Sequence, residues 1–147
     1  MTVALLDVNV LVALLWPSHV HHDKAHEWFA EHAAEGWATC PLTQLGFVRL
    51  SSNPGIIPEA VSAQQAAKLL RHNTGHQHHV FWPDDIPLAD PQIPVSQIMG
   101  HQQLTDAYLL GLAIQNGGKL VTLDASISFL LPSQDPRRDA LEIIGTT

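Results

Sequence analysis

The feature that most constrains the fold is an apolar run at the beginning of the chain, Val3–Val12, which contains a single carboxylate, Asp7. A short apolar run of this kind predicts a strand that is buried on both faces of a parallel sheet. An aspartate in such a run marks the point where the strand ends at a crevice, which is where open α/β sheets bind ligands. After Asp7 the apolar residues take helical spacing, so we expect a helix to follow the strand directly.

Later segments repeat this alternation of strand and helix. The apolar and turn patterns predict strands at 37–40, 79–82, 119–124 and 141–144, and helices at about 20–34, 41–50, 62–72 and 102–115, with a short helix at 125–131. The proline-rich passage at 83–94 is typical of a structured loop. Strands that alternate with helices predict parallel βαβ units with helices on both faces of the sheet. We therefore expect an α/β sandwich with a central, mainly parallel sheet of four to five strands.

Length and composition indicate one domain. The chain has 147 residues, of which 46% are apolar, and this is enough for one core, so we expect a single domain over residues 1–147. The charged fraction is 14% and the formal net charge is −7, which excludes a broad basic surface. A polyanionic substrate would therefore need a bound divalent metal, a basic rim or a basic partner chain to offset this charge.

The cysteine content and the lengths of the apolar runs indicate the cellular compartment. Its single cysteine, Cys40, cannot form a disulfide within the chain, and we expect it to be a buried small apolar residue. No basic segment precedes the first strand, and no apolar run approaches the roughly 18 residues that a spanning helix needs. We expect a soluble protein of the cytoplasm without a membrane partner.

Three aspartates stand in comparable places along the predicted sheet. Asp7 and Asp124 follow predicted parallel strands, and Asp106 lies near the start of a predicted helix, so all three point to one crevice. Converging carboxylates repel unless a cation lies between them, and oxygen ligands without cysteine suit Mg²⁺ or Mn²⁺ better than Zn²⁺. Such a metal activates water for attack on a phosphodiester. Capping of the following helix is the open alternative for each aspartate.

Four motifs give a specific resemblance. They are Asp-x-Asn after the first strand, Thr-Gln-Leu-Gly-Phe-Val-Arg-Leu-Ser-Ser-Asn-Pro at 43–54, His-x-x-Leu-Thr-Asp-Ala-Tyr-Leu at 101–109, and Val-Thr-Leu-Asp at 121–124. Together they resemble the PIN-domain ribonucleases of the VapC toxin type over nearly the whole chain. The resemblance implies a three-layer α/β/α sandwich, Mg²⁺- or Mn²⁺-dependent endonucleolytic cleavage of RNA, a homodimer and a cognate antitoxin. It also implies that Asp7, Asp106 and Asp124 are the catalytic, metal-binding acids, with Asn9 as a supporting group.

One position departs from this family pattern. Many PIN domains carry a glutamate in the helix after the second strand, whereas this helix contains no acid and has Gln44 near its start. Gln44 is our candidate for a neutral ligand or a holder of water. Three carboxylates in place of four bind a second metal less readily, so we expect one well-held ion at most.

Other polar residues have competing interpretations. Arg49 suits either RNA phosphate or a structural ion pair, and Asp84 and Asp85 suit either the rim of the crevice or a solvated turn. His101 suits either a helix cap or contact with substrate. A zinc site among the histidines is disfavoured, because neither His21, His22 and His26 nor His76, His78 and His79 are accompanied by ligands at zinc spacing.

Two other functions compete with the nuclease. A haloacid-dehalogenase-like phosphatase also begins with an aspartate after its first strand, but it needs a second acid where this chain has Asn9, and Lys119 is at the wrong end of its strand. A non-catalytic PIN-like binding module is favoured by the missing glutamate and disfavoured by the three aspartates. The segment around Trp28, Phe29 and Trp37 suits an antitoxin or a second subunit, although we expect at least two of these rings to be in the core.

Overall fold

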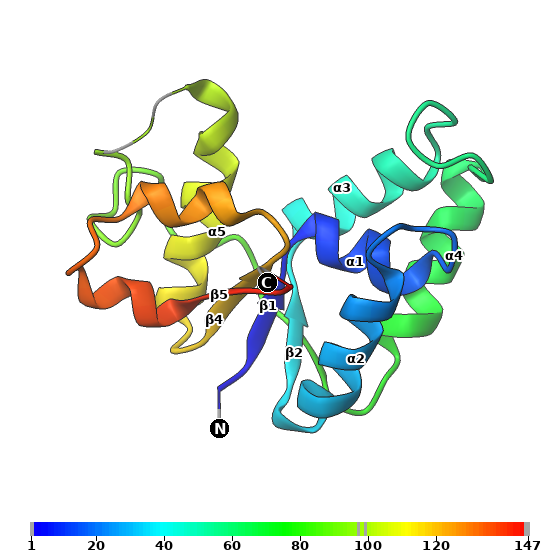
Figure 1. The fold of residues 1–147 in the computed structure, drawn as a ribbon, viewed down its shortest axis with the longest axis horizontal. Coiled ribbons are helices and arrows are strands. Elements are labelled where there is room, and N and C mark those ends of the chain that lie inside the picture. Colours follow the sequence, from blue (N-terminus) through cyan, green and yellow to red (C-terminus); the bar gives the residue numbers. More distant parts are fainter. Residues whose placement is uncertain (1, 97, 99, 146–147) are drawn as a thin grey trace.

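A five-stranded sheet organises the molecule (Figure 1). The computed structural model describes residues 2–96, 98 and 100–145. All the strand pairs are parallel, and the order across the sheet is β3-β2-β1-β4-β5. The strands are β1 (Ala4–Leu6), β2 (Trp37–Thr39), β3 (His79–Phe81), β4 (Lys119–Thr122) and β5 (Leu141–Ile143). This confirms the α/β sandwich and places the first strand at the centre of the sheet.

Helices cover both faces of the sheet, with α1 to α4 on one side and α5 on the other (Figure 1). They are α1 (Val8–Leu15), α2 (His22–His32), α3 (Pro41–Ser51), α4 (Ala63–Thr74) and α5 (Leu104–Gln115). Short 3₁₀ segments are η1 (Ala33–Glu35), η2 (His101–Gln103), η3 (Ala125–Leu130) and η4 (Pro136–Ala140). Several details differ from expectation. The predicted helix at 20–34 is α-helical over His22–His32, and the predicted strand at 119–124 ends at Thr122. The predicted helix at 102–115 begins as η2 and becomes α-helical only at Leu104, and the segment at 125–131 is 3₁₀ rather than α-helical.

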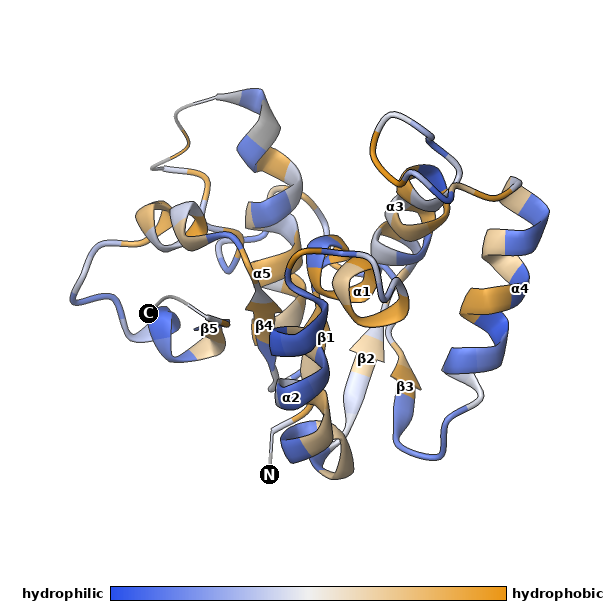
Figure 2. Cartoon of the chain, turned by 45° about the vertical axis from the view of Figure 1, so that its right-hand side comes forward, coloured by the Kyte–Doolittle hydropathy of each residue, from blue (hydrophilic) through white to orange (hydrophobic). Residues whose placement is uncertain are grey.

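The strands build a separate core on each face because their side chains alternate. Leu5 and Leu120 point to the side of α5, where they pack with Ile93 and the buried residues of that helix. Leu6 and Val121 point to the opposite side, where they pack with α1 to α4. Figure 2 shows that α5 is hydrophobic over most of its length, whereas α2 and α4 carry many hydrophilic residues. The helix α5, which is buried over most of its surface, therefore covers one face of the sheet. The other face is covered by α1 to α4, of which α2 and α4 are amphipathic.

The remaining expectations about the chain are met in part. Cys40 is fully buried, and the Trp28 and Trp37 rings are in the core, as expected. In the part of the chain that the structure describes, every helix is too short or too polar to cross a bilayer. The described strands all belong to one sheet, but a single domain over residues 1–147 stays a prediction, because its ends lie outside the described residues.

Candidate active site

Asp7 lies where β1 ends and α1 begins, at the centre of the sheet. Its backbone N–H continues the parallel ladder by donating to the Val121 carbonyl at 2.9 Å. Its carboxylate accepts two hydrogen bonds, at Oδ1 from the Val8 amide and at Oδ2 from the Thr122 hydroxyl, each of 2.8 Å. The residue is 6% exposed, so the same side chain caps α1 and is a buried acid. Each oxygen keeps a further lone pair that can bind a cation.

Thr122, the last residue of β4, joins the two central strand ends. Its fully buried hydroxyl donates to Asp7 and accepts from Asn9 Nδ2 at 3.2 Å and from the Asp124 amide at 3.1 Å. Asn9 Oδ1 accepts from the Leu123 amide at 3.1 Å, so both polar ends of the Asn9 side chain are committed to this strand end. Asn9 therefore supports the site by fixing β4 beside α1. Sequence reasoning missed Thr122, although a threonine in a buried strand two residues before Asp124 was a signal for such a network.

Asp124 follows the same strand and caps η3. Its Oδ1 accepts from the Ser126 amide at 3.0 Å and from the Ser126 hydroxyl at 2.7 Å. Its Oδ2 makes no hydrogen bond with any residue that the structure describes. Asp124 therefore caps a helical segment, as the open alternative for this residue stated. Only Oδ1 is used for the cap, so Oδ2 can still bind a cation.

Asp106 lies in the first turn of α5 and is half-buried. The pKa of its carboxyl is raised to about 7, mainly by burial and in addition by the neighbouring charges of Asp7 and Asp124. The pKa of Asp7 is also raised, by burial and by Asp124, against the opposing effect of its hydrogen bonds from Thr122 and Val8. Repulsion between the carboxylates agrees with their positions, since Asp7 caps α1, Asp106 lies in the first turn of α5 and Asp124 caps η3.

This donor set fits a divalent metal in an open site. The contributors to the pKa of Asp106 include no cation, so its negative charge is uncompensated by the protein. Among the residues described, no group of three or more His, Cys, Asp or Glu side chains is arranged to hold a metal ion. The fit therefore rests on the chemistry of the donors, since Mg²⁺ and Mn²⁺ prefer carboxylate oxygens, keep several water or substrate oxygens and need only a few carboxylates from the protein.

Gln44 lies near the start of α3, at the same edge of the sheet. Its Nε2 donates to Thr39 Oγ1 at 2.9 Å rather than to any of the three aspartates. Its expected role as a neutral ligand or a holder of water stays a prediction.

The other candidate residues are all exposed side chains. Arg49 is exposed in the last turn of α3 and takes part in neither of the two ion pairs of the described residues, which are Lys119–Glu142 and Arg137–Asp135. Asp84 and Asp85 lie exposed in the loop after β3, where Gln115 Nε2 donates to Asp85 at 3.0 Å. His101 is exposed at the start of η2. Contact of these residues with RNA stays untested.

The histidines form no zinc site within the described residues. The His22 and His26 rings lie 5.7 Å apart, and His22 Nδ1 is bonded to the Ala13 carbonyl at 2.8 Å. Lys119 begins β4, far from Asp124, and pairs with Glu142, so it is not available to a phosphatase-like site.

Comparison with known proteins decides the family. The family model of the PIN domain matches residues 4–129. This chain belongs to the PIN-domain family. As a PIN-domain protein it is 48% identical over 134 residues to Ribonuclease VapC38 of Mycobacterium tuberculosis, an alignment that covers 91% of this chain and 93% of that protein. It is 45% identical over 129 residues to Ribonuclease VapC39 of the same species, over 85% of this chain and 91% of that protein.

The PIN fold is supported independently by a solved structure. The crystal structure of VapBC2 from Rickettsia felis, bound to a DNA fragment from its promoter, matches with a TM-score of 0.61 over 97% of this chain and 99% of that chain. The identity is 14%, so this likeness concerns the fold alone. The resemblance predicted from the four motifs is confirmed, and membership of the PIN family removes the phosphatase alternative.

Proposed function

We propose that this PIN-domain protein is a metal-dependent endoribonuclease, and that it acts as the toxin of a toxin–antitoxin pair. The observation that carries this function is the uncompensated charge of Asp7, Asp106 and Asp124 at the carboxyl end of the sheet. The relatives at 45–48% identity are called ribonucleases, which supports RNA as the substrate. Retention of all three acids disfavours the non-catalytic binding module.

Each residue of the site has a proposed role. Asp7, Asp106 and Asp124 would hold one Mg²⁺ or Mn²⁺, which supplies an activated water and neutralises the phosphodiester. Thr122 holds Asp7 in place through its hydroxyl, and Asn9 fixes the end of β4. Because the net charge is −7, a bound metal would favour the approach of RNA to the crevice by offsetting the charge of the acids.

Cleavage of an RNA panel tests this function. Purified protein is assayed with Mg²⁺ or Mn²⁺ and with excess chelator, together with Asp106→Asn and, as a matched control, Asp23→Asn on the exposed face of α2. We expect chelator to abolish cleavage and Asp106→Asn to lower it at least about 100-fold, since a catalytic metal contributes several kcal/mol. Asp23→Asn should match the wild type. Equal cleavage by Asp106→Asn and wild type would contradict the assignment.

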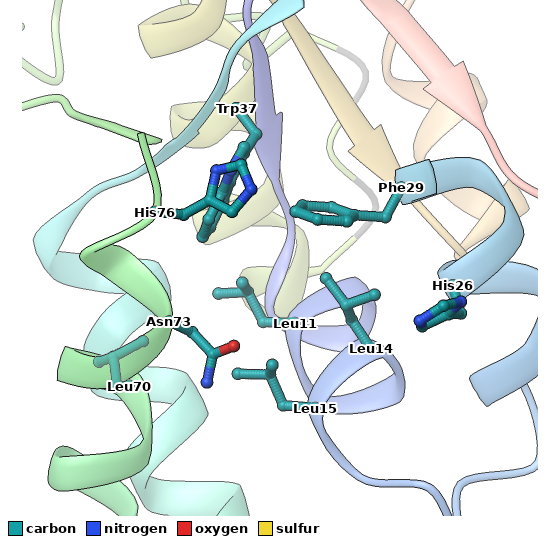
Figure 3. A pocket seen from close by; sticks show the side chains of 9 residues that line it. All are labelled: Leu11, Leu14, Leu15, His26, Phe29, Trp37, Leu70, Asn73 and His76. Atoms are coloured by element: carbon teal, nitrogen blue, oxygen red, sulfur yellow. The ribbon is translucent and has the colours of Figure 1, made fainter. Parts of the chain in front are cut away.

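An apolar cavity on the α1–α4 face is our candidate for the antitoxin surface (Figure 3). The cavity has a volume of 230 Å³, and nine side chains from α1, α2, β2, α4 and the loop after α4 line it: Leu11, Leu14, Leu15, His26, Phe29, Trp37, Leu70, Asn73 and His76. Its size suits one apolar side chain of a partner protein.

A homodimer completes the proposal. Leu88 and Leu104 are exposed large apolar residues, and they line a second hollow with Tyr108. We assign this face to a second copy of the chain. Sedimentation velocity should therefore give the mass of two chains, and Leu88→Asp should give the mass of one. We also place the protein in the cytoplasm, where its RNA substrate and antitoxin would be.

A further inference from the structure

Ser126 contacts the carboxylate of Asp124 through two hydrogen bonds to one oxygen. Its amide donates to Asp124 Oδ1 at 3.0 Å, and its hydroxyl donates to the same oxygen at 2.7 Å. The amide bond alone makes Asp124 the N-cap of η3. The hydroxyl bond is therefore an addition that capping does not require.

The lone pairs of Asp124 show the effect of this addition. An ionised carboxylate has about four lone-pair sites, which are shared equally between its two oxygens. Ser126 uses both sites of Oδ1, whereas Oδ2 accepts no hydrogen bond from the residues that the structure describes. A cation that binds Asp124 is therefore left with Oδ2 alone.

The carboxylate of Asp7 is bonded in a different way. Its Oδ1 accepts from the Val8 amide and its Oδ2 from the Thr122 hydroxyl, so each oxygen keeps one site for a cation. Both oxygens of Asp7 can bind, but only one oxygen of Asp124 can. The limit to one oxygen is therefore a consequence of Ser126 and not a general property of these acids.

The rest of η3 holds Ser126 in place. Figure 1 shows η3, in orange, leaving the end of β4. Ile127 and Leu130 are buried in the core on the α5 side, and Arg138 Nη2 donates to the Ser128 carbonyl at 2.8 Å from outside the segment. Because η3 is fixed on two sides, the hydroxyl of Ser126 stays on Oδ1 when a cation approaches Oδ2.

The number of oxygens that a carboxylate offers discriminates between divalent cations. Ca²⁺ takes roughly six to eight oxygens in a flexible geometry and accepts both oxygens of one carboxylate. Mg²⁺ requires an octahedral geometry, keeps several waters and uses single carboxylate oxygens. A carboxylate with one available oxygen therefore suits Mg²⁺ and removes one ligand from Ca²⁺.

We propose that Ser126 is a positioning residue that sets the metal selectivity of the site: by occupying Asp124 Oδ1 it leaves Oδ2 as the single ligand atom, which disfavours Ca²⁺ relative to Mg²⁺. This inference rests on the proposed function, because it takes Asp7, Asp106 and Asp124 as the metal site. Ser126 acts through Asp124 and touches neither the metal nor the substrate.

Calorimetric titration of the metal-free protein, with Mg²⁺ and separately with Ca²⁺, tests the selectivity. Ser126→Ala keeps the amide that caps η3 and frees one site on Oδ1. We expect the ratio of the Kd for Ca²⁺ to the Kd for Mg²⁺ to fall at least about 5-fold in Ser126→Ala, because Ca²⁺ gains an oxygen that Mg²⁺ does not use. Ser126→Thr keeps the hydroxyl, so its ratio should stay within about 2-fold of wild type.

Ser128→Ala is the matched control. The Ser128 hydroxyl belongs to the same segment but donates to the Ala125 carbonyl at 2.8 Å and not to an acid. Its removal should leave the ratio of the two Kd values unchanged. A merely structural role of Ser126 would weaken the binding of both cations alike, so an unchanged ratio in Ser126→Ala, or an equal change in Ser128→Ala, would overturn the inference.

Failure of this inference can be told apart from failure of the proposed function. If the wild type cleaves RNA with Mg²⁺ and Ser126→Ala has the wild-type ratio, the role of Ser126 is wrong while the nuclease stands. If the wild type binds the cations but cleaves no RNA, the nuclease fails and the ratio still decides the role of Ser126. Binding of neither cation by the wild type would overturn both.

Infrared spectra of the wild type decide the question if Ser126→Ala does not fold. The carboxylate stretching bands that are lost in Asp124→Asn belong to Asp124, and their separation differs between binding through one oxygen and through two. We expect binding through one oxygen with Mg²⁺ and with Ca²⁺. Binding of Ca²⁺ through both oxygens of Asp124 in the wild type would overturn the inference.

Discussion

Asp106 is the residue whose chemistry most distinguishes this site from an ordinary cluster of surface acids. Its pKa of about 7, against an ordinary value of 3.8, means that the folded protein binds this proton more tightly than the unfolded chain does. Stability therefore falls as the pH rises from about 4 toward 7, because folding then places a charge among other charges. A divalent metal removes this penalty by binding the ionised form.

The first prediction concerns the melting temperature of Asp106→Asn. The melting temperature of Asp106→Asn minus that of the wild type should increase by roughly 2–4 °C between pH 5 and pH 8. The increase is modest because solvent screens a half-exposed carboxyl. Mg²⁺ should raise the melting temperature of the wild type at pH 8 and have little effect on that of Asp106→Asn. Differential scanning fluorimetry measures this, with Asp23→Asn as the control. A gap that stays constant from pH 5 to pH 8 would show that Asp106 titrates normally.

At the scale of elements, the contact of α3 with α1 sets how closely these two helices approach beside the sheet. Gly46 permits this contact, because any side chain there meets Val8. Both helices begin at strand ends, so their first turns lie at the edge where the acids gather. A small displacement of α3 would therefore move one side of the candidate site without altering the sheet.

The second prediction is that Gly46→Ala destabilises the protein by about 1–3 kcal/mol, because overpacking outweighs the better helix propensity of alanine. Val8→Ala should restore most of the loss in the double variant by opening the space that the new methyl group needs. Urea denaturation measures both. Gly100→Ala is the control, since a Cβ at Gly100 meets no atom of the described residues within 4 Å. Equal stability of Gly46→Ala and wild type would show that the helices separate at little cost.

The elements were the part of the structure that the sequence predicted best. Buried parallel strands are short apolar runs, so all five strands and the five α-helices could be located from periodicity and turn residues. The boundary of α5 was missed by two residues, because the η2 turn that precedes it has no distinct pattern. The three acids could be grouped because parallel strands share one carboxyl edge.

The hydrogen bonds of the site could not be predicted in the same way. The hydroxyls of Thr122 and Thr39 each bond a neighbour that is remote in sequence, 115 residues away for Asp7 and 40 for His79. Such pairs depend on the strand order β3-β2-β1-β4-β5, and no local pattern states that order. Gln44 was singled out from the family pattern, but its partner was not.

At the scale of the whole molecule, the sheet separates two surfaces with different proposed partners. The cavity on the α1–α4 face is assigned to an antitoxin, and the apolar hollow beside the N-terminal part of α5 is assigned to a second copy of the chain. RNA would enter at the edge between them. These assignments can be separated by substitutions that affect one partner and leave the others unchanged.

The third prediction concerns Leu14, which lines the cavity in Figure 3. Leu14→Asn should weaken binding of the cognate antitoxin at least about 10-fold, because a polar group would replace part of an apolar anchor site. RNA cleavage should stay within about 2-fold of wild type. Calorimetry measures the affinity, and Phe129→Asn, at an exposed residue of η3, serves as the control. Equal antitoxin affinity in Leu14→Asn and Phe129→Asn would place the antitoxin elsewhere.

Titration of the metal-free protein with Mn²⁺ is the measurement that tests the central claim most directly, because it asks whether Asp7, Asp106 and Asp124 form one metal site before any RNA is present. We predict that the wild type binds one ion per chain, that Asp106→Asn binds it at least about 10-fold more weakly, and that Asp23→Asn equals the wild type. Undiminished binding of Mn²⁺ by Asp106→Asn, or no binding by the wild type at millimolar Mn²⁺, would contradict a shared metal centre at the end of the sheet.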